Sequence, residues 1–395
     1  MIAPFSIARL PRIEFGAGSL RRLPDIASGY GKRLLLVTGQ SSFDASAGGA
    51  WLYEALRAQR FAWEQVRVTG EPSPHFVDGV VAQFHHDPFD AVVGIGGGSA
   101  LDAAKAIAGL LRLGNSVMDH LEGVGPEEPY RGPATPFIAV PTTAGTGSEA
   151  TKNAVLSVHG AAGFKKSFRD DQLVAEWAIV DPDLLDGCPP ALIAADGMDA
   201  FTQLLESFVS SRANPLTDAL ARSGIAAANQ GLLDWHAGGE RAAQGRERMA
   251  YASLLSGICL AQTGLGSVHG LAAPLGAFFP IPHGVACGTL VAAATRVNVE
   301  AVTLRDPRSP ALAKYAKIGR CLSGRSELGE AQAHEALLAV LHNWQQALEL
   351  PRLSRYGVTA ADVPRIVASS RGSSMKTNPI ALTDAEVGRI VTARL

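Results

Sequence analysis

The sequence contains little charge and no excess of either sign. Only 18% of its 395 residues are charged, and 35 Lys and Arg nearly balance 37 Asp and Glu, which gives a formal net charge of −2. Proteins that coat nucleic acid or a membrane surface carry a clustered basic excess, so we expect neither partner. Hydrophobic residues make up 47% of the chain, and this share excludes the polar, charge-rich composition of intrinsic disorder.

Cysteine is scarce, and no two cysteines are close in the sequence. The four are Cys188, Cys259, Cys287 and Cys321. No pair forms a CxxC motif of the zinc-binding or redox type, so the pattern predicts small apolar residues in a reducing compartment. The first residues show no targeting signal, because Arg9 and Arg12 interrupt their apolar run. We therefore expect a cytoplasmic protein.

Residues 249–295 contain no Asp, Glu, Lys or Arg. The stretch is long enough for a membrane span, but Pro274, Pro280, Pro282 and several glycines interrupt it. Such residues disfavour a lipid-exposed helix. We predict helices buried in a protein core instead.

The pattern of predicted secondary structure changes once along the chain, and the length of the chain favours two domains. Up to residue 188, short apolar runs typical of buried strands alternate with helical patterns; the runs are 33–39, 89–95, 136–141 and 177–182. This alternation predicts a parallel α/β sheet covered by helices on both faces. After Pro189 the pattern is helical, with helices expected at 191–210, 216–227, 247–260, 334–348 and 383–395. We predict an α/β domain over 1–188 and an all-helical domain over 189–395.

A glycine-rich turn follows the second of these apolar runs. Gly96, Gly97 and Gly98 precede Ser99, which has the position of a helix N-cap, and Asp102 follows at the spacing of a capping box. Glycines allow a ligand to approach the backbone, and a helix start presents free N–H groups to an anion. One glycine would satisfy a simple tight turn. The sequence therefore favours a phosphate-binding turn, although it lacks both the GxGxxG and the P-loop patterns.

A hydroxyl-rich loop follows the next apolar run. Its hydroxyl residues are Thr142, Thr143, Thr146, Ser148 and Thr151. Loops at the carboxyl ends of parallel strands are where α/β folds bind ligands, although Ser and Thr also bond locally to backbone. Together with the glycine turn, this loop predicts one long phosphate-bearing ligand.

Four polar residues stand in apolar surroundings in the second half. Asp199 and Gln203 lie four residues apart, on one face of a predicted helix. His269 lies in a predicted helix of the uncharged stretch, and His283 lies at a predicted loop-to-helix junction. Imidazoles and a carboxylate are ligands for Zn²⁺ or Fe²⁺. The alternative is a pair of hydrogen-bonded core histidines, which the spacing alone favours because no HxxxH or HExxH motif is present.

Taken together, these segments resemble the iron-containing (group III) alcohol dehydrogenase family over essentially the whole chain. The matching segments are GGGSALDAAKAIA, PTTAGTGSEAT, AIVDPDLL, DGMDAFTQLLESFVSSRANPLTDALA, GLGSVHGLAAPLGAFFPIPHGVACG and SSMKTNPIALTD. The resemblance implies a dehydroquinate synthase-like architecture, with a nucleotide-binding α/β domain, a helical domain and a cleft between them. It implies hydride transfer between NAD or NADP and a small alcohol, aldehyde or ketone, assisted by a divalent metal. It also implies a homo-oligomer, a dimer at least.

The resemblance assigns roles to residues by position. Gly97, Gly98 and Ser99 correspond to diphosphate-binding positions. The rest of the expected cofactor site is Gly39, Asp102, Thr142, Thr143, Thr146, Ser148, Thr151 and Lys165. The expected metal ligands are Asp199, Gln203, His269 and His283, and the expected catalytic residues are Asp199, His269 and His283.

Two residues depart from the family pattern near the expected metal. Gln203 stands where the family usually has a histidine, and an amide oxygen is a weaker and harder donor than imidazole. The metal is then held less tightly, is zinc or magnesium instead of iron, or is absent. Ala273 stands where many members have a second histidine near the nicotinamide. We therefore expect the proton to travel through water or a ribose hydroxyl.

A third departure concerns the cofactor. Gly39 stands where NAD-specific members carry an aspartate, which bonds the ribose 2′-OH and repels a 2′-phosphate. Its absence predicts that NADP is accepted. Ser41 and Ser42 could donate to the phosphate, and Lys32 or Arg33 could add positive charge.

Two alternatives remain open at this point. A metal-independent enzyme of the maleylacetate reductase kind would need cationic side chains for a dicarboxylate, and the stretch with Leu271, Ala272, Leu275, Phe278 and Phe279 has none. A nucleotide-binding protein without turnover would fit an eroded site, but Asp199, His269 and His283 are intact.

Overall fold

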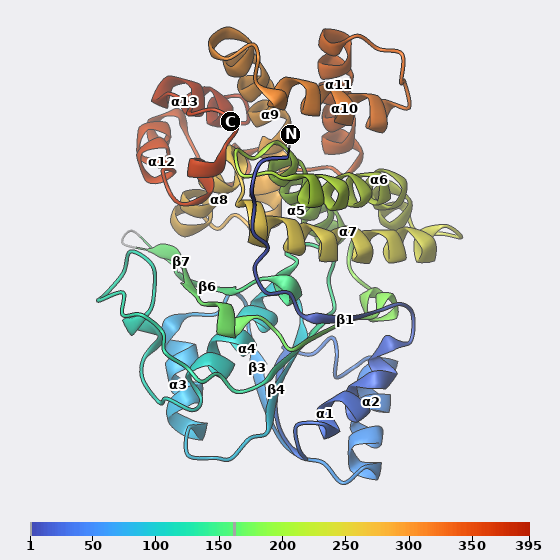
Figure 1. The fold of residues 1–395 in the computed structure, drawn as a ribbon, viewed down its shortest axis with the longest axis vertical. Coiled ribbons are helices and arrows are strands. Elements are labelled where there is room, and N and C mark those ends of the chain that lie inside the picture. Colours follow the sequence, from blue (N-terminus) through green and yellow to red (C-terminus); the bar gives the residue numbers. More distant parts are fainter. Residues whose placement is uncertain (1, 161–162) are drawn as a thin grey trace. The chain divides into compact units, whose positions relative to one another are not determined.

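The computed structural model describes residues 2–160 and 163–395 (Figure 1). The chain divides into two compact units. One comprises Ala8–Cys188, and the other comprises Pro189–Leu395 together with residues 2–7. The first is α/β and the second is helical, which confirms the predicted fold class.

A parallel sheet forms the centre of the α/β unit. Among the described residues it has six strands, in the order β1-β8-β5-β4-β2-β3. Their bounds are β1 (Arg12–Phe15), β2 (Arg33–Gly39), β3 (Ala62–Val68), β4 (Ala91–Gly96), β5 (Phe137–Pro141) and β8 (Trp177–Val180). The helices of this unit are α1 (Leu23–Ser28), α2 (Ala47–Ala58), α3 (Pro74–Phe84) and α4 (Gly98–Leu110).

Both faces of this sheet are buried, as the continuous apolar runs predict. Successive side chains of a strand point to opposite faces. Leu34 and Leu36 of β2 therefore pack with residues of α1 and α2, while Leu35 and Val37 pack with residues of α3 and α4. Figure 1 shows α1 and α2 on one side of the sheet and α3 and α4 on the other.

The carboxyl ends of three neighbouring strands bring the predicted turns together. β4 lies between β2 and β5, and Gly96 pairs with Pro141. The N–H of Thr142 donates to the carbonyl oxygen of Gly96 at 2.9 Å. The glycine turn, the hydroxyl-rich loop and the end of β2 at Gly39 therefore share one edge of the sheet.

A two-stranded antiparallel hairpin, absent from the sequence prediction, follows the hydroxyl-rich loop. It consists of β6 (Asn153–Val158) and β7 (Phe164–Arg169). Ala154, Leu156 and Phe168 are fully buried in the same apolar cluster as residues of α4. This packing fixes the hairpin to the α/β unit.

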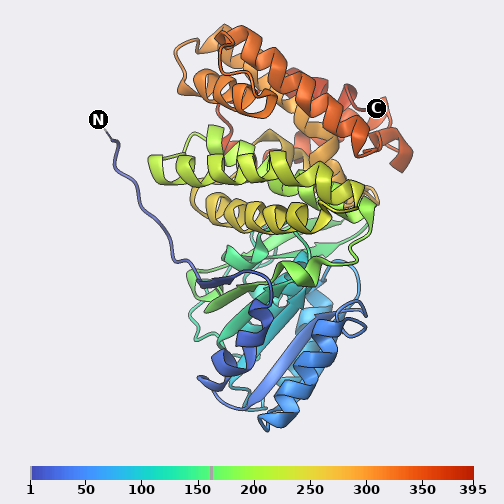
Figure 2. The ribbon, with the colours of Figure 1, turned by 90° about the vertical axis from the view of Figure 1, so that its right-hand side faces the viewer.

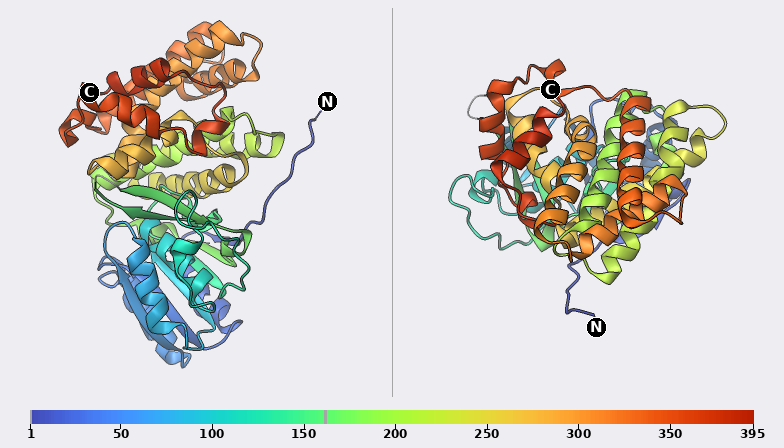
Figure 3. Two further views of the ribbon diagram at one scale, coloured as in Figure 1. Left: turned by 90° about the vertical axis from the view of Figure 1, so that its left-hand side faces the viewer. Right: turned by 90° about the horizontal axis from the view of Figure 1, so that it is seen from above.

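Two long helices of the helical unit start at a proline, and one of them is also capped by a side chain. Pro190 and Pro215 each stand in the first turn of a helix, where a missing N–H costs nothing, and Asn214 forms a capping box with Thr217. The helices are α5 (Pro190–Val209), α6 (Pro215–Ala237), α7 (Ala242–Thr263), α8 (Ser267–Phe278), α9 (His283–Arg305), α10 (Pro310–Ser323), α11 (Glu330–Ala347), α12 (Val363–Ser369) and α13 (Asp384–Thr392). Within this unit α6 and α7 run side by side, and α5 packs against α6, α7 and α9 (Figures 2 and 3).

The uncharged stretch forms α8, most of α7 and the first half of α9. Among the described residues, α9 is the one helix long and apolar enough to cross a membrane, and 72% of its most apolar window is buried inside the protein. It is therefore a core helix of the helical unit.

Candidate metal centre and nucleotide site

Helix α5 supplies the first two predicted site residues. Asp199 and Gln203 are one helical turn apart, so their side chains lie on the same face. Nε2 of Gln203 donates to Oδ2 of Asp199 at 3.2 Å, and both side chains are buried. The shared face that the spacing predicts is therefore present.

Helix α8 supplies His269, whose ring orientation is set by Glu206 of α5. The Glu206 carboxylate accepts the backbone N–H groups of Gly266 (2.9 Å) and Val268 (2.7 Å) at the start of α8. It also lies 2.7 Å from Nδ1 of His269. Since a carboxylate accepts, Nδ1 carries the hydrogen, and Nε2 is the nitrogen that faces Asp199 Oδ1 at 3.1 Å.

Helix α9 supplies two further side chains. His283 is its first residue, and Cys287 follows one turn later. The Cys287 sulfur lies 3.6 Å from Nε2 of His269 and 3.8 Å from Nε2 of His283. Nε2 of His283 lies 3.8 Å from Oδ1 of Asp199.

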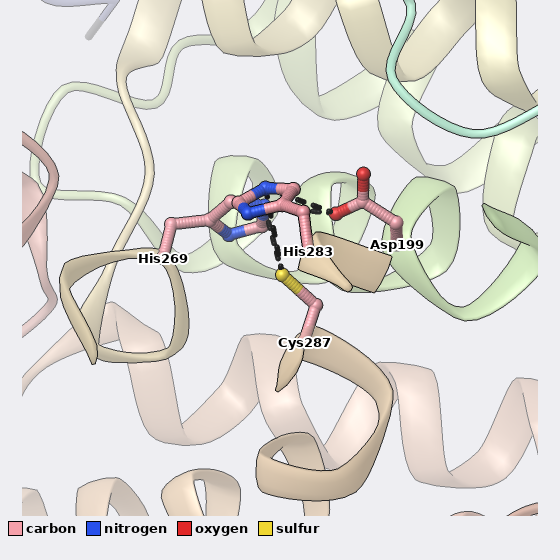
Figure 4. Close-up of side chains that lie close together, drawn as sticks. All are labelled: Asp199, His269, His283 and Cys287. Atoms are coloured by element: carbon pink, nitrogen blue, oxygen red, sulfur yellow. Dashed lines mark hydrogen bonds and ion pairs between the residues drawn. The ribbon is translucent and has the colours of Figure 1, made fainter. Parts of the chain in front are cut away.

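The four side chains converge on one point (Figure 4). One potential ligand atom from each of Asp199, His269, His283 and Cys287 lies within 4.8 Å of every other. Three of these residues are predicted by the sequence. Cys287 is not, although its four-residue spacing from His283 at a helix start is a signal that could have identified it.

The carboxylate and the imidazoles of the cluster stabilise each other's charged forms. Burial raises the pKa of Asp199, but the neighbouring His283 and His269 outweigh burial and hold that pKa below its ordinary value. Burial lowers the pKa of His269, but the Cys287 sulfur and the flanking carboxylates outweigh burial and raise that pKa well above its ordinary value. Burial raises the pKa of the Cys287 thiol to about 12.

The cluster fits a divalent metal. Its donors are one carboxylate, two imidazoles and a sulfur, all of which serve as ligands of zinc or iron. The Glu206–His269 hydrogen bond is the outer-shell contact that commonly fixes a metal-binding imidazole. Gln203 lies beside the cluster, but its Oε1 accepts a hydrogen bond from Ser256 at 2.7 Å.

Access to the cluster lies on the side of His283. Its side chain is 28% exposed, whereas those of His269 and Asp199 are 5% and 2% exposed. The apolar residues Leu271, Ala272 and Leu275 of α8 are fully buried, so they belong to the core and do not line an open site. For these three residues, the argument from their apolar character against a dicarboxylate substrate therefore loses its support.

The glycine turn lies at the N-terminus of α4 and is tightly packed. Gly97 is the N-cap of α4, a helix of 13 residues. A Cβ on Gly98 would lie 2.6 Å from Cγ2 of Thr146, and one on Gly97 would lie 3.2 Å from Cγ2 of Thr143. The two predicted loops thus pack directly against each other, and the free N–H groups of α4 point out of this turn.

The expected capping box at Ser99 does not form. The N-cap is Gly97, so Ser99 lies within the first turn of α4. Asp102 instead accepts hydrogen bonds from the Ser148 hydroxyl and from the N–H of Val155, at 3.1 Å for the latter. These contacts tie α4 to the hydroxyl-rich loop and to β6.

A buried lysine joins the same network. Lys105 Nζ donates to the carbonyl oxygen of Ser148 (2.8 Å) and to the hydroxyl of Thr151 (2.9 Å). Burial lowers the pKa of Lys105 to about 8, against the opposing effect of Asp102 and Glu149. Elsewhere, Lys165 of β7 is 2.6 Å from Glu71. The cofactor contacts expected of Asp102, Ser148, Thr151 and Lys165 stay predictions.

Gly39 ends β2 beside open space. A Cβ built on it meets no described atom within 4 Å. Lys32 precedes β2 and Arg33 begins it. At about 3.3 Å per residue, both lie about 20 Å from Gly39, which ends the strand. The expectation that they add positive charge near Gly39 is therefore wrong. Arg67 of β3 is a cation near this end of the sheet, since it pairs with Thr38 of β2 and binds Asp44 at 2.8 Å.

Comparisons with known proteins identify the family. The model of the iron-containing alcohol dehydrogenase family matches residues 11–182, and the model of its C-terminal domain matches residues 193–395. The chain belongs to the iron-containing alcohol dehydrogenase family. It is therefore an oxidoreductase.

Members of this family resemble the chain over nearly its full length. Alcohol dehydrogenase 4 of Saccharomyces cerevisiae is 31% identical over 97% of this chain and 96% of its own. Lactaldehyde reductase of Escherichia coli is 30% identical over 90% of each chain. The crystal structure of a 1,3-propanediol oxidoreductase, 28% identical, superposes with a TM-score of 0.88 and covers all of both chains.

Proposed function

We propose that this alcohol dehydrogenase interconverts small alcohols with their aldehydes or ketones, using NAD or NADP and a divalent metal. The observation that carries the proposal is the convergence of Asp199, His269 and His283 in one buried cluster. The enzymes named lactaldehyde reductase and 1,3-propanediol oxidoreductase support a small polar substrate.

The metal would be held by Asp199, His269, His283 and one further donor. Bound there, a divalent metal supplies Lewis-acid chemistry toward a carbonyl oxygen, and zinc and iron are both candidates.

The protein's own residues orient this site. Glu206 fixes His269 with Nε2 toward Asp199, and the start of α8 is held by the same carboxylate. The exposed edge of His283 faces the side from which a substrate can enter. Ala273 has no group that releases a proton, so the proton that the product alcohol needs comes from water or a ribose hydroxyl.

The cofactor diphosphate would bind at the N-terminus of α4, over Gly97, Gly98 and Ser99. The open space beside Gly39 leaves room for a 2′-phosphate. Arg67 supplies a cation at the neighbouring strand end, where it is half-exposed. We therefore propose that NADPH is accepted.

Turnover measurements with and without a chelator test this function. We expect aldehyde-dependent oxidation of NADPH that a chelator abolishes and added metal restores. Turnover that resists complete metal removal would favour the metal-independent reductase. Binding of NADPH without turnover of any short aldehyde or ketone would favour a nucleotide-binding protein without activity.

We also propose a cytoplasmic location. Cys259, Cys287 and Cys321 form no disulfide in the described part of the chain, and reduced thiols persist in a reducing compartment.

A further inference from the structure

We infer that Cys287, and not Gln203, is the fourth ligand of the metal, so that the site is built of Asp199, His269, His283 and a thiolate. This inference rests on the proposed function, since it concerns the metal of that same site. It departs from the ligand set expected from the sequence, in which Gln203 takes the place of a histidine.

The distances between donor atoms carry the inference. Around a tetrahedral metal with bonds of about 2.0 to 2.3 Å, neighbouring donors are about 3.3 to 3.8 Å apart. The Cys287 sulfur is 3.6 Å from His269 Nε2 and 3.8 Å from His283 Nε2. Asp199 Oδ1 is 3.1 Å from His269 Nε2 and 3.8 Å from His283 Nε2. These four separations lie close to what one shared metal requires.

The hydrogen bonds of Gln203 direct its oxygen elsewhere. Oε1 accepts from the hydroxyl of Ser256 at 2.7 Å, and Nε2 donates to Oδ2 of Asp199 at 3.2 Å. Turning the amide over would place its oxygen against the Asp199 carboxylate, and two acceptors would then face each other. Gln203 therefore orients the Asp199 carboxylate and leaves Oδ1 for the metal.

Charge also favours the thiolate. Asp199 and a Cys287 thiolate together balance a divalent cation, whereas Asp199 with neutral donors leaves one positive charge in a buried site. On binding, the S–H bond breaks, the sulfur–metal bond forms and the proton leaves to solvent.

The donor set further selects the metal. Replacing an imidazole with a softer thiolate favours zinc over iron(II). The histidine that the family usually has at position 203 would come from α5, whereas Cys287 comes from α9. The fourth ligand is therefore supplied by a different helix. We therefore expect the purified enzyme to bind Zn²⁺ more tightly than Fe²⁺.

Cobalt substitution tests the sulfur ligand directly. The full-length protein is stripped of metal and titrated with Co²⁺, and its absorption spectrum is compared with that of Cys287→Ser and of Cys321→Ser, an exposed matched control. We expect a sulfur-to-cobalt charge-transfer band in the near ultraviolet for the wild type and for Cys321→Ser. The band should be lost in Cys287→Ser, with Zn²⁺ affinity lowered at least about a hundredfold, beyond the usual range for an outer-shell residue.

A second variant keeps the test valid if Cys287→Ser fails to fold. Gln203→Ala should retain the charge-transfer band and lose no more than about a hundredfold in Zn²⁺ affinity, the usual range for an outer-shell residue. Two results would overturn the inference even if aldehyde reduction continued. One is a wild-type protein that binds cobalt without the charge-transfer band. The other is loss of metal from Gln203→Ala but not from Cys287→Ser. Failure of the proposed function would appear instead as absent turnover in protein that holds its metal.

Discussion

Oε2 of Glu206 lies 2.7 Å from Nδ1 of His269, and this contact decides which nitrogen of the imidazole faces Asp199. The same carboxylate accepts two backbone N–H groups at the start of α8. One side chain of α5 therefore positions both a helix and the ring that this helix carries.

Replacing Glu206 with glutamine should weaken metal binding. The amide oxygen can still accept hydrogen bonds, but the NH₂ group that replaces the other carboxylate oxygen faces an N–H donor, so that two donors oppose each other. Loss of such an outer-shell contact typically costs ten- to a hundredfold in metal affinity, and we expect a fall of that size in Zn²⁺ competition with a chelator. Glu300→Gln, at an exposed ion pair with Arg389, is the matched control. Unchanged affinity in Glu206→Gln would argue against a positioning role.

Replacing His269 with alanine should remove metal and activity together. The imidazole contributes a donor atom at the centre of the cluster, 3.1 Å from Asp199 and 3.6 Å from Cys287. We expect metal content by elemental analysis to fall severalfold or more and kcat to fall at least about a hundredfold. His342→Ala on the exposed side of α11 should change neither. A variant with full metal content and full activity would contradict the site.

Placing aspartate at Gly39 should discriminate between the two nicotinamide cofactors. The position has room for the side chain, and the new carboxylate repels a 2′-phosphate while it can bond a ribose 2′-OH. We expect KM for NADPH to rise at least about tenfold and KM for NADH to change little. Gly39→Asn, of the same size without the charge, should leave the ratio of the two KM values near that of the wild type. Equal effects of Gly39→Asp on both cofactors would refute a role for this position.

The sequence predicted best those elements whose residue pattern is set by burial alone. Residues 33–39 read as a continuous apolar run because both faces of the sheet are covered, and β2 has these bounds. β3 was missed because Glu64 and Arg67 interrupt its apolar residues at the edge of the sheet. The bounds of the long helix α9 were not predicted, because small and apolar residues cover it almost all round and show no helical period.

The candidate site was predictable in part for a similar reason. Asp199, His269 and His283 stood out as polar groups in apolar surroundings, and burial makes such groups conspicuous. Cys287 did not stand out, because a lone cysteine is compatible with any apolar position. Glu206 was overlooked because its contacts to α8 join residues about 60 positions apart, and no local pattern encodes such a separation.

Glu149 gives the α/β unit a pH-dependent stability that can be measured apart from the metal. Burial raises the pKa of Glu149 to about 7, although Lys105 opposes the shift. Between the ordinary pKa of about 4.5 and pH 7, the folded protein holds a proton that the unfolded chain releases. Stability from this group is therefore fully present below about pH 4.5 and is lost as pH rises toward 7 and above, by up to about 3 kcal/mol.

Glu149→Gln should remove this dependence, because the amide is neutral at every pH and has nearly the same volume. In urea unfolding, we expect the variant to gain stability relative to the wild type between pH 5 and pH 8, by about 2 to 3 kcal/mol. Glu54→Gln, on the exposed face of α2, should show no such change. The free energies of unfolding of variant and wild type could instead differ by the same amount at pH 5 and at pH 8. That result would mean that Glu149 is ionised in the folded protein at both pH values and that Lys105 compensates for its burial.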